Sequence, residues 1–315
     1  KNAIVDSFLT ANPVLPFIED TIAHYIYYGT AQTVTIPGDA NLWNINEWSM
    51  IKFSGIELWF KPQTIEMDAR LEYKFVLNGS NWISDPRNPL HFGNYNNSVL
   101  AMPDYVFPPE VNYYPDILHG TSFDTTLYSS QLQNTRYVRI YLPPGYNPAS
   151  LDTYPIIVFH DGYGWWNEGK ANNILDYLID KKRIQPLIGV FIPPVEREDE
   201  YAFNKTTQFE DFITWELMPY IDSRFRTKTD PNQRAMTGVS YGGLITTQIC
   251  YNHPEIFGLA APFSAAYNPK NREVFNSVVN GLKKDIKWYM EWGTYENEIL
   301  LDVPMKDSLL SKGYD

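Results

Sequence analysis

The stretch RAMTGVSYGGLITTQ, residues 234–248, decides the fold. Its first half is an apolar run typical of a buried strand, and its second half is typical of an apolar helix. Between them, GVSYG fits the pattern G-x-S-x-G, with Gly238 and Gly242 on either side of Ser240. A side chain at either glycine would crowd a tight strand-to-helix turn, whereas the serine hydroxyl projects from that turn. The stretch therefore predicts an α/β sheet that carries a nucleophilic serine.

A serine nucleophile also needs backbone donors for the oxyanion that its attack creates. Tyr241 opens the predicted helix, so its N–H can face that charge. The stretch VFHDGYGWW, residues 158–166, ends an earlier apolar strand. The loop after such a strand supplies the second donor in α/β sheets with this serine turn, and we expect that donor to be Gly162 or Tyr163.

The sequence on both sides of these stretches supports the same fold class. From about residue 121 onward, short apolar strands alternate with amphipathic helices, which indicates βαβ units and a mostly parallel sheet. The helix predicted over residues 206–225 is expected to begin at a capping box of Thr207 and Glu210. We therefore expect an α/β domain over residues 121–315.

The N-terminal third has a different sequence pattern. After a short leading helix, residues 1–105 contain alternating runs separated by Gly, Pro and Asn, which predict a β-sandwich. Residues 106–120 are rich in Pro and Tyr and are expected to form a linker that lies against a surface.

The composition argues against several classes of function. The chain has 315 residues and a formal net charge of −12 with no long basic run, which does not fit a nucleic-acid or membrane partner. No apolar run approaches the roughly 20 residues that span a bilayer. The one cysteine, Cys250, cannot form an internal disulfide and is expected in the core. No His, Asp or Cys cluster has metal-ligand spacing, so we expect no metal or other cofactor.

The first residues, KNAIVDSFLT, lack the apolar block of a signal peptide, and the chain does not begin with Met. We expect the sequence to begin after a processing site or at an artificial boundary. A secreted or periplasmic location is slightly favoured over a cytoplasmic one.

Four stretches together resemble the esterase group of α/β-hydrolases, which includes enterochelin esterases, esterase D and feruloyl or acetyl-xylan esterases. They are YPIIVFHDGYGWW, GVFIPPVEREDEYAFN, ELMPYIDSRFRT and AMTGVSYGGLITTQICYNHPEIFG. The run REDEY, residues 197–201, is most similar to the enterochelin-esterase branch. The resemblance covers roughly residues 125–315. It implies a serine carboxylic-ester hydrolase that forms an acyl-enzyme on Ser240.

The N-terminal part resembles the immunoglobulin-like, early-set domain, similar to glycogen-binding modules, that precedes some of these esterases. AQTVTIPGDANLW and LEYKFVLNGSNWISDPRNP carry this resemblance. Because exposed Trp residues hold glucan in the sugar-binding relatives, Trp43, Trp48 and Trp82 are candidates for a glycan contact. The alternative is that they pack inside the sandwich or against the other domain. An alternative interpretation of the whole chain is a catalytically inactive hydrolase relative that serves as a carbohydrate-binding protein.

The resemblance also implies an acid and a base. The family places its acid in a G-x-x-[DE] turn after a late strand, which Gly293 and Glu296 match, with Glu298 and Asp302 as alternatives. The family's base lies in a GGH-x-W-like loop after the last full helix, but no histidine follows Glu296. We therefore expect the catalytic histidine beyond Asp315. Residues 1–315 alone would then be nearly inactive, because a serine without its base is a poor nucleophile.

Three of the five histidines deserve an assignment of their own. His160 is expected to be structural, because it precedes Ser240 whereas the α/β-hydrolase order is Ser, acid, His. His253 is expected to end the helix that follows the serine. His119, in the linker, is the alternative base.

The substrate is less well specified by the sequence. Trp165 and Trp166 follow the second oxyanion segment, so one of them is expected to flank an aryl or sugar ring. Arg197 is expected either to meet an anionic or catechol-type substrate or to pair with an acidic neighbour in residues 198–200. The expected small-molecule or polysaccharide-linked substrates are an aryl or siderophore ester, or a feruloyl or acetyl ester of plant polysaccharide. Hydrolysis and transacylation both remain open.

Overall fold

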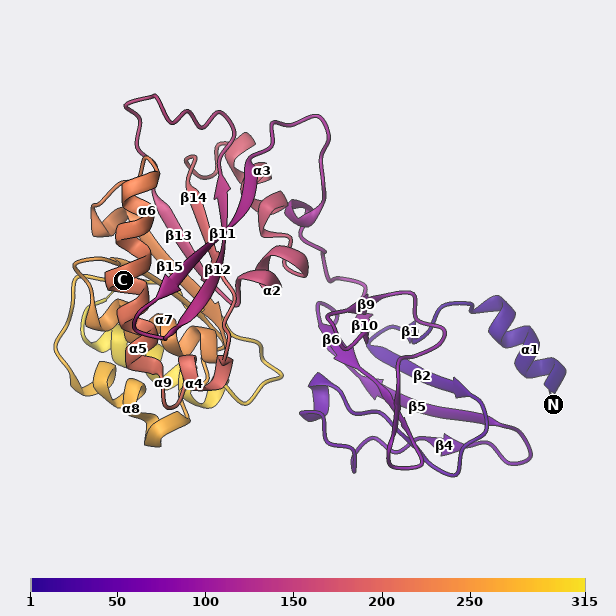
Figure 1. Ribbon diagram of the computed structural model, residues 1–315. Helices are drawn as coiled ribbons and strands as arrows, with labels where there is room; N and C mark the ends of the chain where they lie inside the picture. Colours follow the sequence, from indigo (N-terminus) through magenta and orange to yellow (C-terminus); the bar gives the residue numbers. More distant parts are fainter. Residues whose placement is uncertain (1, 315) are drawn as a thin grey trace. The chain divides into compact units, whose positions relative to one another are not determined.

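A seven-stranded sheet organises the chain from Pro109 onward in the computed structural model, which describes residues 2–314 (Figure 1). The chain divides into two units, with the first 108 residues and Tyr295–Asn297 forming the N-terminal unit and the rest forming the C-terminal unit. The strand order of the large sheet is β11-β12-β14-β13-β15-β16-β17. The bounds are β11 (Thr121–Ser129), β12 (Asn134–Leu142), β13 (Ile156–His160), β14 (Ile188–Ile192), β15 (Arg234–Val239), β16 (Leu259–Phe263) and β17 (Lys287–Trp288).

The pairing in this sheet is antiparallel at one edge and parallel elsewhere. β11 and β12 form a hairpin, and β12 pairs antiparallel with β14. From β14 to β17 every neighbouring pair is parallel. The mostly parallel sheet that the sequence predicts is therefore confirmed, and Ser240 follows β15, which lies between β13 and β16 in its parallel part.

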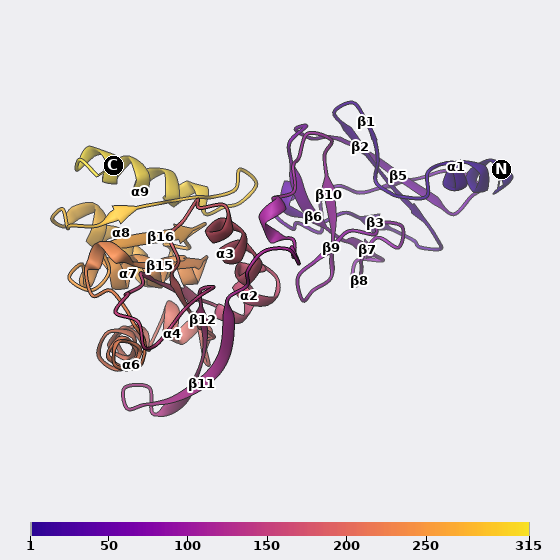
Figure 2. The same cartoon turned by 90° about the horizontal axis from the view of Figure 1, so that it is seen from above.

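Helices cover both faces of the sheet, as Figure 2 shows from above. Side chains alternate along each strand. Val158 and Val190 therefore face the larger core with α5 to α9, while Phe159 and Phe191 face α2 and α3. The helical elements are α2 (Gly162–Asn167), α3 (Ala171–Asp180), α4 (Arg197–Tyr201), α5 (Thr206–Asp211), the π-helical η3 (Phe212–Leu217), α6 (Met218–Arg224), the short η4 (Pro231–Gln233), α7 (Tyr241–Asn252), α8 (Pro269–Asn280) and α9 (Ile299–Ser311).

The helix predicted over residues 206–225 is present as α5, η3 and α6 in succession, but its predicted capping box is wrong. Helix α5 begins at Thr206 with Lys205 at the N-cap, and no side chain caps it. The reason is tertiary, because the Glu210 carboxylate accepts hydrogen bonds from Gln248 and Asn252 of α7 instead.

Residues 109–120 run along helix α3. The short helix η2 (Pro109–Val111) is joined to it by the Asn173 side chain, which donates to the Val111 carbonyl at 2.9 Å. Asp176, buried on α3, accepts hydrogen bonds from the Gly120 N–H at 2.8 Å and the Tyr141 hydroxyl at 2.6 Å. These bonds hold the start of β11 against the helical layer.

The N-terminal unit is all-β after helix α1 (Asn2–Ala11), as the sequence predicts. Its core contains Tyr25, Tyr73 and Phe75, whose rings pack edge to face. Its immunoglobulin-like topology stays a prediction. Its strands form three small sheets, β1 (Phe17–Glu19), β2 (Ile22–Tyr28), β5 (Leu58–Thr64) and β4 (Ile51–Lys52); β6 (Arg70–Tyr73), β10 (Asn97–Ala101) and β9 (His91–Phe92); and β3 (Val34–Thr35), β7 (Phe75–Leu77) and β8 (Asn81–Ile83), with the short helix η1 (Asp39–Asn41) between β3 and β4.

Candidate active site

Ser240 lies at the turn from β15 into α7 and has an unusual backbone, with φ 59° and ψ −119°. A positive φ strains a residue that carries a Cβ, and such strain is concentrated at functional sites. Two backbone bonds hold the turn, because Ser240 donates to the Phe263 carbonyl at 3.0 Å and accepts from the Ala266 N–H at 3.2 Å. The Ser240 side chain makes no capping bond to α7, so its hydroxyl is not tied to the helix.

The glycines around Ser240 are required by close backbone contacts. A Cβ on Gly238 would lie 2.5 Å from the carbonyl carbon and oxygen of Gly242. A Cβ on Gly243 would lie 2.9 Å from the Ala265 side chain. These distances are shorter than van der Waals contact, so the first glycine of the G-x-S-x-G pattern and the glycine that follows the pattern both reflect real crowding.

The loop predicted to supply the second oxyanion donor lies beside this turn. A Cβ on Gly242 would lie 3.2 Å from Asp161 Oδ2 and 3.5 Å from His160 Cβ. Gly162 is the first residue of α2 and packs so tightly that a Cβ there would lie 2.4 Å from the Ile192 nitrogen. The first N–H groups of a helix have no partner inside the helix. The structure thus places the turn at Ser240 and Tyr241 next to the segment that precedes Gly162 and Tyr163.

Arg197 connects these two segments. Its Nε donates to Asp161 Oδ1 at 2.8 Å, and its Nη2 donates to Asp161 Oδ2 at 2.7 Å. Nη2 also donates to the Val239 carbonyl at 3.3 Å, one residue before Ser240. The ion pair is therefore with Asp161, which the sequence did not single out, and not with the acidic residues 198–200.

The rest of helix α4 is anchored in the core. Glu200 forms a fully buried, two-bond ion pair with Arg136 of β12, with N–O distances of 2.7 and 2.9 Å. The Tyr201 hydroxyl accepts a hydrogen bond from the Asp161 N–H at 3.0 Å. The REDEY run therefore binds Asp161 through Arg197 and Tyr201, and it is fixed to β12 through Glu200.

His160 is fully buried between the rings of Tyr201 and Phe209. Neither ring nitrogen has a hydrogen-bonding partner among residues 2–314. Burial and, to a lesser extent, the charge of Arg197 together lower the pKa of His160 to about 3. The imidazole is therefore neutral at pH 7, and its surroundings fit the structural role expected from the sequence.

The other two histidines of the C-terminal unit are engaged elsewhere. His119 lies 2.8 Å from Asp176 Oδ2 through Nδ1 and 3.0 Å from the Tyr114 carbonyl through Nε2. His253 ends α7, as expected, and its Nε2 lies 2.9 Å from Glu210 Oε1. His24 and His91 belong to the N-terminal unit.

The aromatic residues of α2 differ in their surroundings. Trp165 packs against Phe159 and Phe263, and Trp166 packs edge to face on Phe191. Tyr163 is 39% exposed. The Arg139 guanidinium lies 5.6 Å from the Tyr163 ring centre and 4.9 Å from that of Trp166.

The predicted acid and its alternatives lie around the start of α9. Glu296 is half-buried in the turn before this helix, in the Tyr295–Asn297 segment grouped with the N-terminal unit. Glu298 is the N-cap of α9. Asp302 is buried within α9, with 1% of its surface exposed. The choice of Glu296 as the acid stays a prediction.

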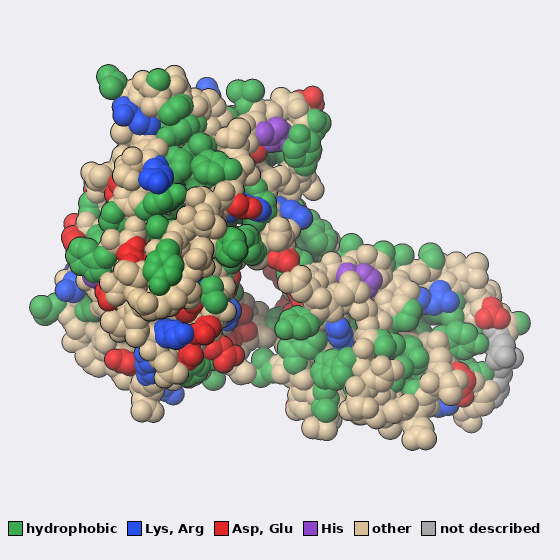
Figure 3. Space-filling view, viewed as in Figure 1, with side chains coloured by type: hydrophobic (Ala, Val, Ile, Leu, Met, Phe, Trp, Pro, Cys, Tyr) green, Lys and Arg blue, Asp and Glu red, His purple; other side chains and the backbone are tan. Residues whose placement is uncertain are grey.

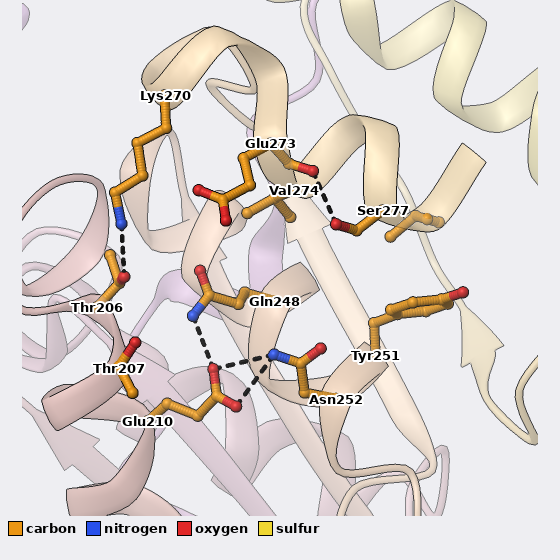
Figure 4. A pocket seen from close by; sticks show the side chains of 11 residues that line it. Thr206, Thr207, Glu210, Gln248, Tyr251, Asn252, Lys270, Glu273, Val274 and Ser277 are labelled. Carbon is orange, nitrogen blue, oxygen red and sulfur yellow. Dashed lines mark hydrogen bonds between the residues drawn. The ribbon is translucent and has the colours of Figure 1, made fainter. Parts of the chain in front are cut away.

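A separate polar cavity of about 280 Å³ lies between α5, α7 and α8 (Figure 4). Gln248, Tyr251 and Asn252 line it from the last turns of α7. At about 1.5 Å per residue, these positions are roughly 10 to 17 Å along the helix from Tyr241, so this cavity is not at the serine. The Glu210 carboxylate accepts hydrogen bonds there from the side-chain amides of Gln248 and Asn252, as the dashed lines show.

The surface, the acidic and metal-ligating side chains and the helices add three further observations. On the face seen in Figure 3, Lys and Arg side chains are scattered among acidic and uncharged ones. Within residues 2–314, no three His, Cys, Asp or Glu side chains come together as a metal site. No helix in the same range combines the length and the apolar composition that crossing a bilayer requires.

No motif in the sequence points directly to Asp161 or to the Arg136–Glu200 pair. Arg136 nevertheless occupies an inward position in β12, where Val138 and Ile140 are the next buried residues. A charged residue in phase with buried apolar ones signals a buried partner, and that signal was available in RYVRIYL, which begins at Arg136.

Comparison with known proteins places this chain in a family. A family model described as "Putative esterase" matches residues 129–303. An endo-1,4-beta-xylanase/feruloyl esterase of Xylanibacter ruminicola is 32% identical over 215 residues, covering 64% of this chain and 29% of the relative. The uncharacterized protein YjcH of Bacillus subtilis is 26% identical over 145 residues, covering 44% of this chain and 60% of that protein. The chain thus spans less than two thirds of the length of these relatives.

Solved structures share the fold at low identity. Ferric enterobactin esterase from Salmonella typhimurium has a TM-score of 0.80 at 16% identity and covers 98% of this chain and 90% of its own. A ferulic acid esterase from Anaeromyces mucronatus has a TM-score of 0.54 at 16% identity, with 66% and 85% covered. The family match spans more than half of the 315 residues. The chain therefore belongs to the esterase family, with an α/β-hydrolase fold that follows an all-β N-terminal region.

Proposed function

We propose that this protein is a serine hydrolase of carboxylic esters and that it forms an acyl-enzyme on Ser240. The observation that carries the proposal is the backbone strain at Ser240, which directly follows β15 and whose side chain makes no capping bond to α7. The turn lies beside Asp161, the residue that precedes the proposed donors Gly162 and Tyr163. In the first step Ser240 Oγ attacks the ester carbonyl, and the alcohol leaves. The N–H groups of Tyr241 and of Gly162 or Tyr163 hold the oxyanion, and water then releases the acid.

The proposed acid is Glu296, which would orient a histidine base and stabilise its charged form. The three histidines of the C-terminal unit have other surroundings, since His119 and His253 pair with carboxylates and His160 is buried. We therefore expect residues 1–315 alone to turn esters over slowly, because loss of a triad member costs about 1,000-fold or more in rate. Rapid turnover by that polypeptide, lost in His119→Ala, would instead assign the base to the linker.

Turnover by the protein with its natural termini tests the serine. Ser240→Ala is expected to lower kcat/KM for an aryl ester by at least about 1,000-fold. Ser277→Ala is the matched control, because Ser277 is an exposed serine on α8. If the Ser240→Ala protein keeps more than a tenth of the activity, the nucleophile is another residue.

The proposed substrate is an aryl ester, with feruloyl esters of plant polysaccharide first and catechol-siderophore esters second. The name of the Xylanibacter relative supports the first, and the fold of the enterobactin esterases supports the second. Tyr163 and the adjoining Trp166 offer aromatic surface beside the proposed oxyanion donors. We expect kcat/KM for methyl ferulate to exceed that for ethyl acetate by about tenfold or more. Equal values would favour the acetyl-ester alternative.

We also propose a glycan contact on the N-terminal unit, centred on Trp43 and Trp82. Their rings stack with centres 6.5 Å apart, and Trp82 is 43% exposed. Trp48 instead packs against Tyr25 at the core. Trp82→Ala should abolish retardation of the protein in a gel containing xylan or glucan, whereas Tyr95→Ala, an exposed aromatic control in the same unit, should not. Unchanged retardation of the Trp82→Ala protein, or none in the wild type, would remove this contact.

A further inference from the structure

The Asp161–Arg197 pair has a geometry that suits positioning. The guanidinium meets the carboxylate through two parallel bonds of 2.8 and 2.7 Å, the arrangement that fixes both distance and orientation. Asp161 itself adopts a left-handed backbone with φ 54° and ψ 41° immediately before Gly162. The side chain of Arg197 therefore holds the residue that sets the direction of the proposed donor loop.

The same guanidinium contacts the serine turn. Nη2 donates to the Val239 carbonyl, and the guanidinium carbon lies 5.7 Å from the ring centre of Tyr241. Ser240 lies between these two residues. Arg197 thus touches both segments that carry the proposed oxyanion donors, and a small error in their separation would misplace the donors.

The Asp161–Arg197 pair also determines the net charge beside the serine turn. Asp161 Oδ2 lies 3.2 Å from where a Cβ of Gly242 would be, so a carboxylate stands beside the serine turn. A negative group at that place would oppose the negative charge that develops during ester attack. Arg197 neutralises it in the resting protein.

Helix α4, which carries Arg197, is held in place by two further contacts. The buried Arg136–Glu200 pair fixes helix α4 to the sheet, and the Tyr201 hydroxyl bonds to the Asp161 N–H. Side chains three and four positions after Arg197 therefore hold the helix from which it reaches the site.

We propose that Arg197 is a positioning residue: by pairing with Asp161 it keeps the donor loop against the Ser240 turn and cancels the carboxylate charge beside the oxyanion. The inference rests on the proposed serine-esterase function. It assigns Arg197 to organisation of the site, whereas a substrate contact would place it on the bound ester.

Steady-state kinetics of the protein with its natural termini separate these roles. Arg197→Gln should lower kcat for neutral methyl ferulate about 100-fold with KM within about threefold, and Arg197→Lys should recover about tenfold of that loss. Asp161→Asn, which tolerates the left-handed backbone, should lower kcat by about tenfold. The double variant should be no slower than Arg197→Gln, because the uncompensated carboxylate is then gone.

Three kinetic outcomes would overturn the inference. One is a kcat for Arg197→Gln within threefold of wild type, and another is a loss confined to KM for an anionic ester. The third is multiplication of the two single losses in the double variant. Arg183→Gln is the matched control, because Arg183 forms an exposed ion pair with Glu110 in the same unit and should leave kcat unchanged.

A readout independent of turnover keeps the inference separate from the proposed function. Amide hydrogen exchange of residues 161–166 should be about tenfold faster in Arg197→Gln than in wild type, because the loop loses its fixed partner. Unchanged exchange would overturn the positioning role even if Ser240→Ala proves the nucleophile. If Ser240→Ala remains active, the serine function fails, and the exchange result alone decides whether Arg197 holds the loop.

Discussion

The turn at Ser240 shows how single residues determine this site. Gly238 faces the backbone of Gly242 so closely that a methyl group there would lie 2.5 Å from two of its atoms. Backbone atoms cannot move away as a flexible side chain can. The conformation that exposes the serine therefore depends on the absence of one Cβ.

Gly238→Ala is expected to lower the free energy of unfolding by about 2 kcal/mol or more, because overpacking against backbone forces the turn to shift. Urea denaturation measures this change. Gly164→Ala is the matched control, since a Cβ at Gly164 would meet only the Glu168 side chain at 3.7 Å. Equal stabilities of the two variants would show that the turn is not crowded.

His160 gives the fold a dependence on pH. Its folded pKa of about 3 lies below the usual value of 6.5, so the unfolded chain binds a proton that the folded chain rejects. Protonation of His160 in the unfolded chain therefore does not lower the free energy of unfolding above pH 6.5. It lowers that free energy progressively as the pH falls from 6.5 toward 3. Between pH 7 and pH 5 this one group should cost about 2 kcal/mol of unfolding free energy.

His160→Phe should remove that part of the pH dependence, because Phe keeps an aromatic ring against Tyr201 and Phe209 and cannot be protonated. Urea denaturation at pH 7 and pH 5 measures the difference for each protein. His91→Gln replaces an exposed histidine and serves as the control. A His160→Phe protein with the full wild-type loss between the two pH values would contradict this assignment.

At the scale of elements, α4 depends on one buried ion pair. Glu200→Gln would leave the Arg136 guanidinium, with 0% of its residue surface exposed, without a charged partner. Removing one partner of a buried pair costs about 3 to 5 kcal/mol. Glu198→Gln on the exposed face of the same helix should change stability by less than about 0.5 kcal/mol, as surface substitutions do. Thermal unfolding of the two variants tests this, and similar midpoints would mean that the pair contributes little.

Elements governed by local sequence were predictable, and those governed by distant partners were not. The strand, turn and helix around Ser240 follow from GVSYG and its apolar flanks. The capping box at Thr207 and Glu210 fits the same kind of local rule, yet Glu210 binds α7 instead. The partner of Arg197 is 36 residues away in the chain, so no local pattern could identify Asp161.

At the scale of the whole molecule, the alternation of apolar strands and amphipathic helices was enough to predict the fold class. A parallel sheet covered on both faces requires that alternation, so the pattern predicts a sheet between two layers of helices. The local geometry was predictable as far as the serine turn and the position beside it of the loop that is proposed to supply an oxyanion donor. The acid and the base depend on tertiary placement of residues far from Ser240 in the sequence, and Glu296 stays a prediction for that reason.

The most direct test of the serine mechanism is to trap the covalent intermediate. The protein with its natural termini is mixed with an aryl ester, quenched in acid within milliseconds and digested for mass analysis. We predict one acyl group, found on the peptide that contains Ser240 and absent from Ser240→Ala. An acyl group on another residue, or undiminished turnover by Ser240→Ala, would contradict the mechanism.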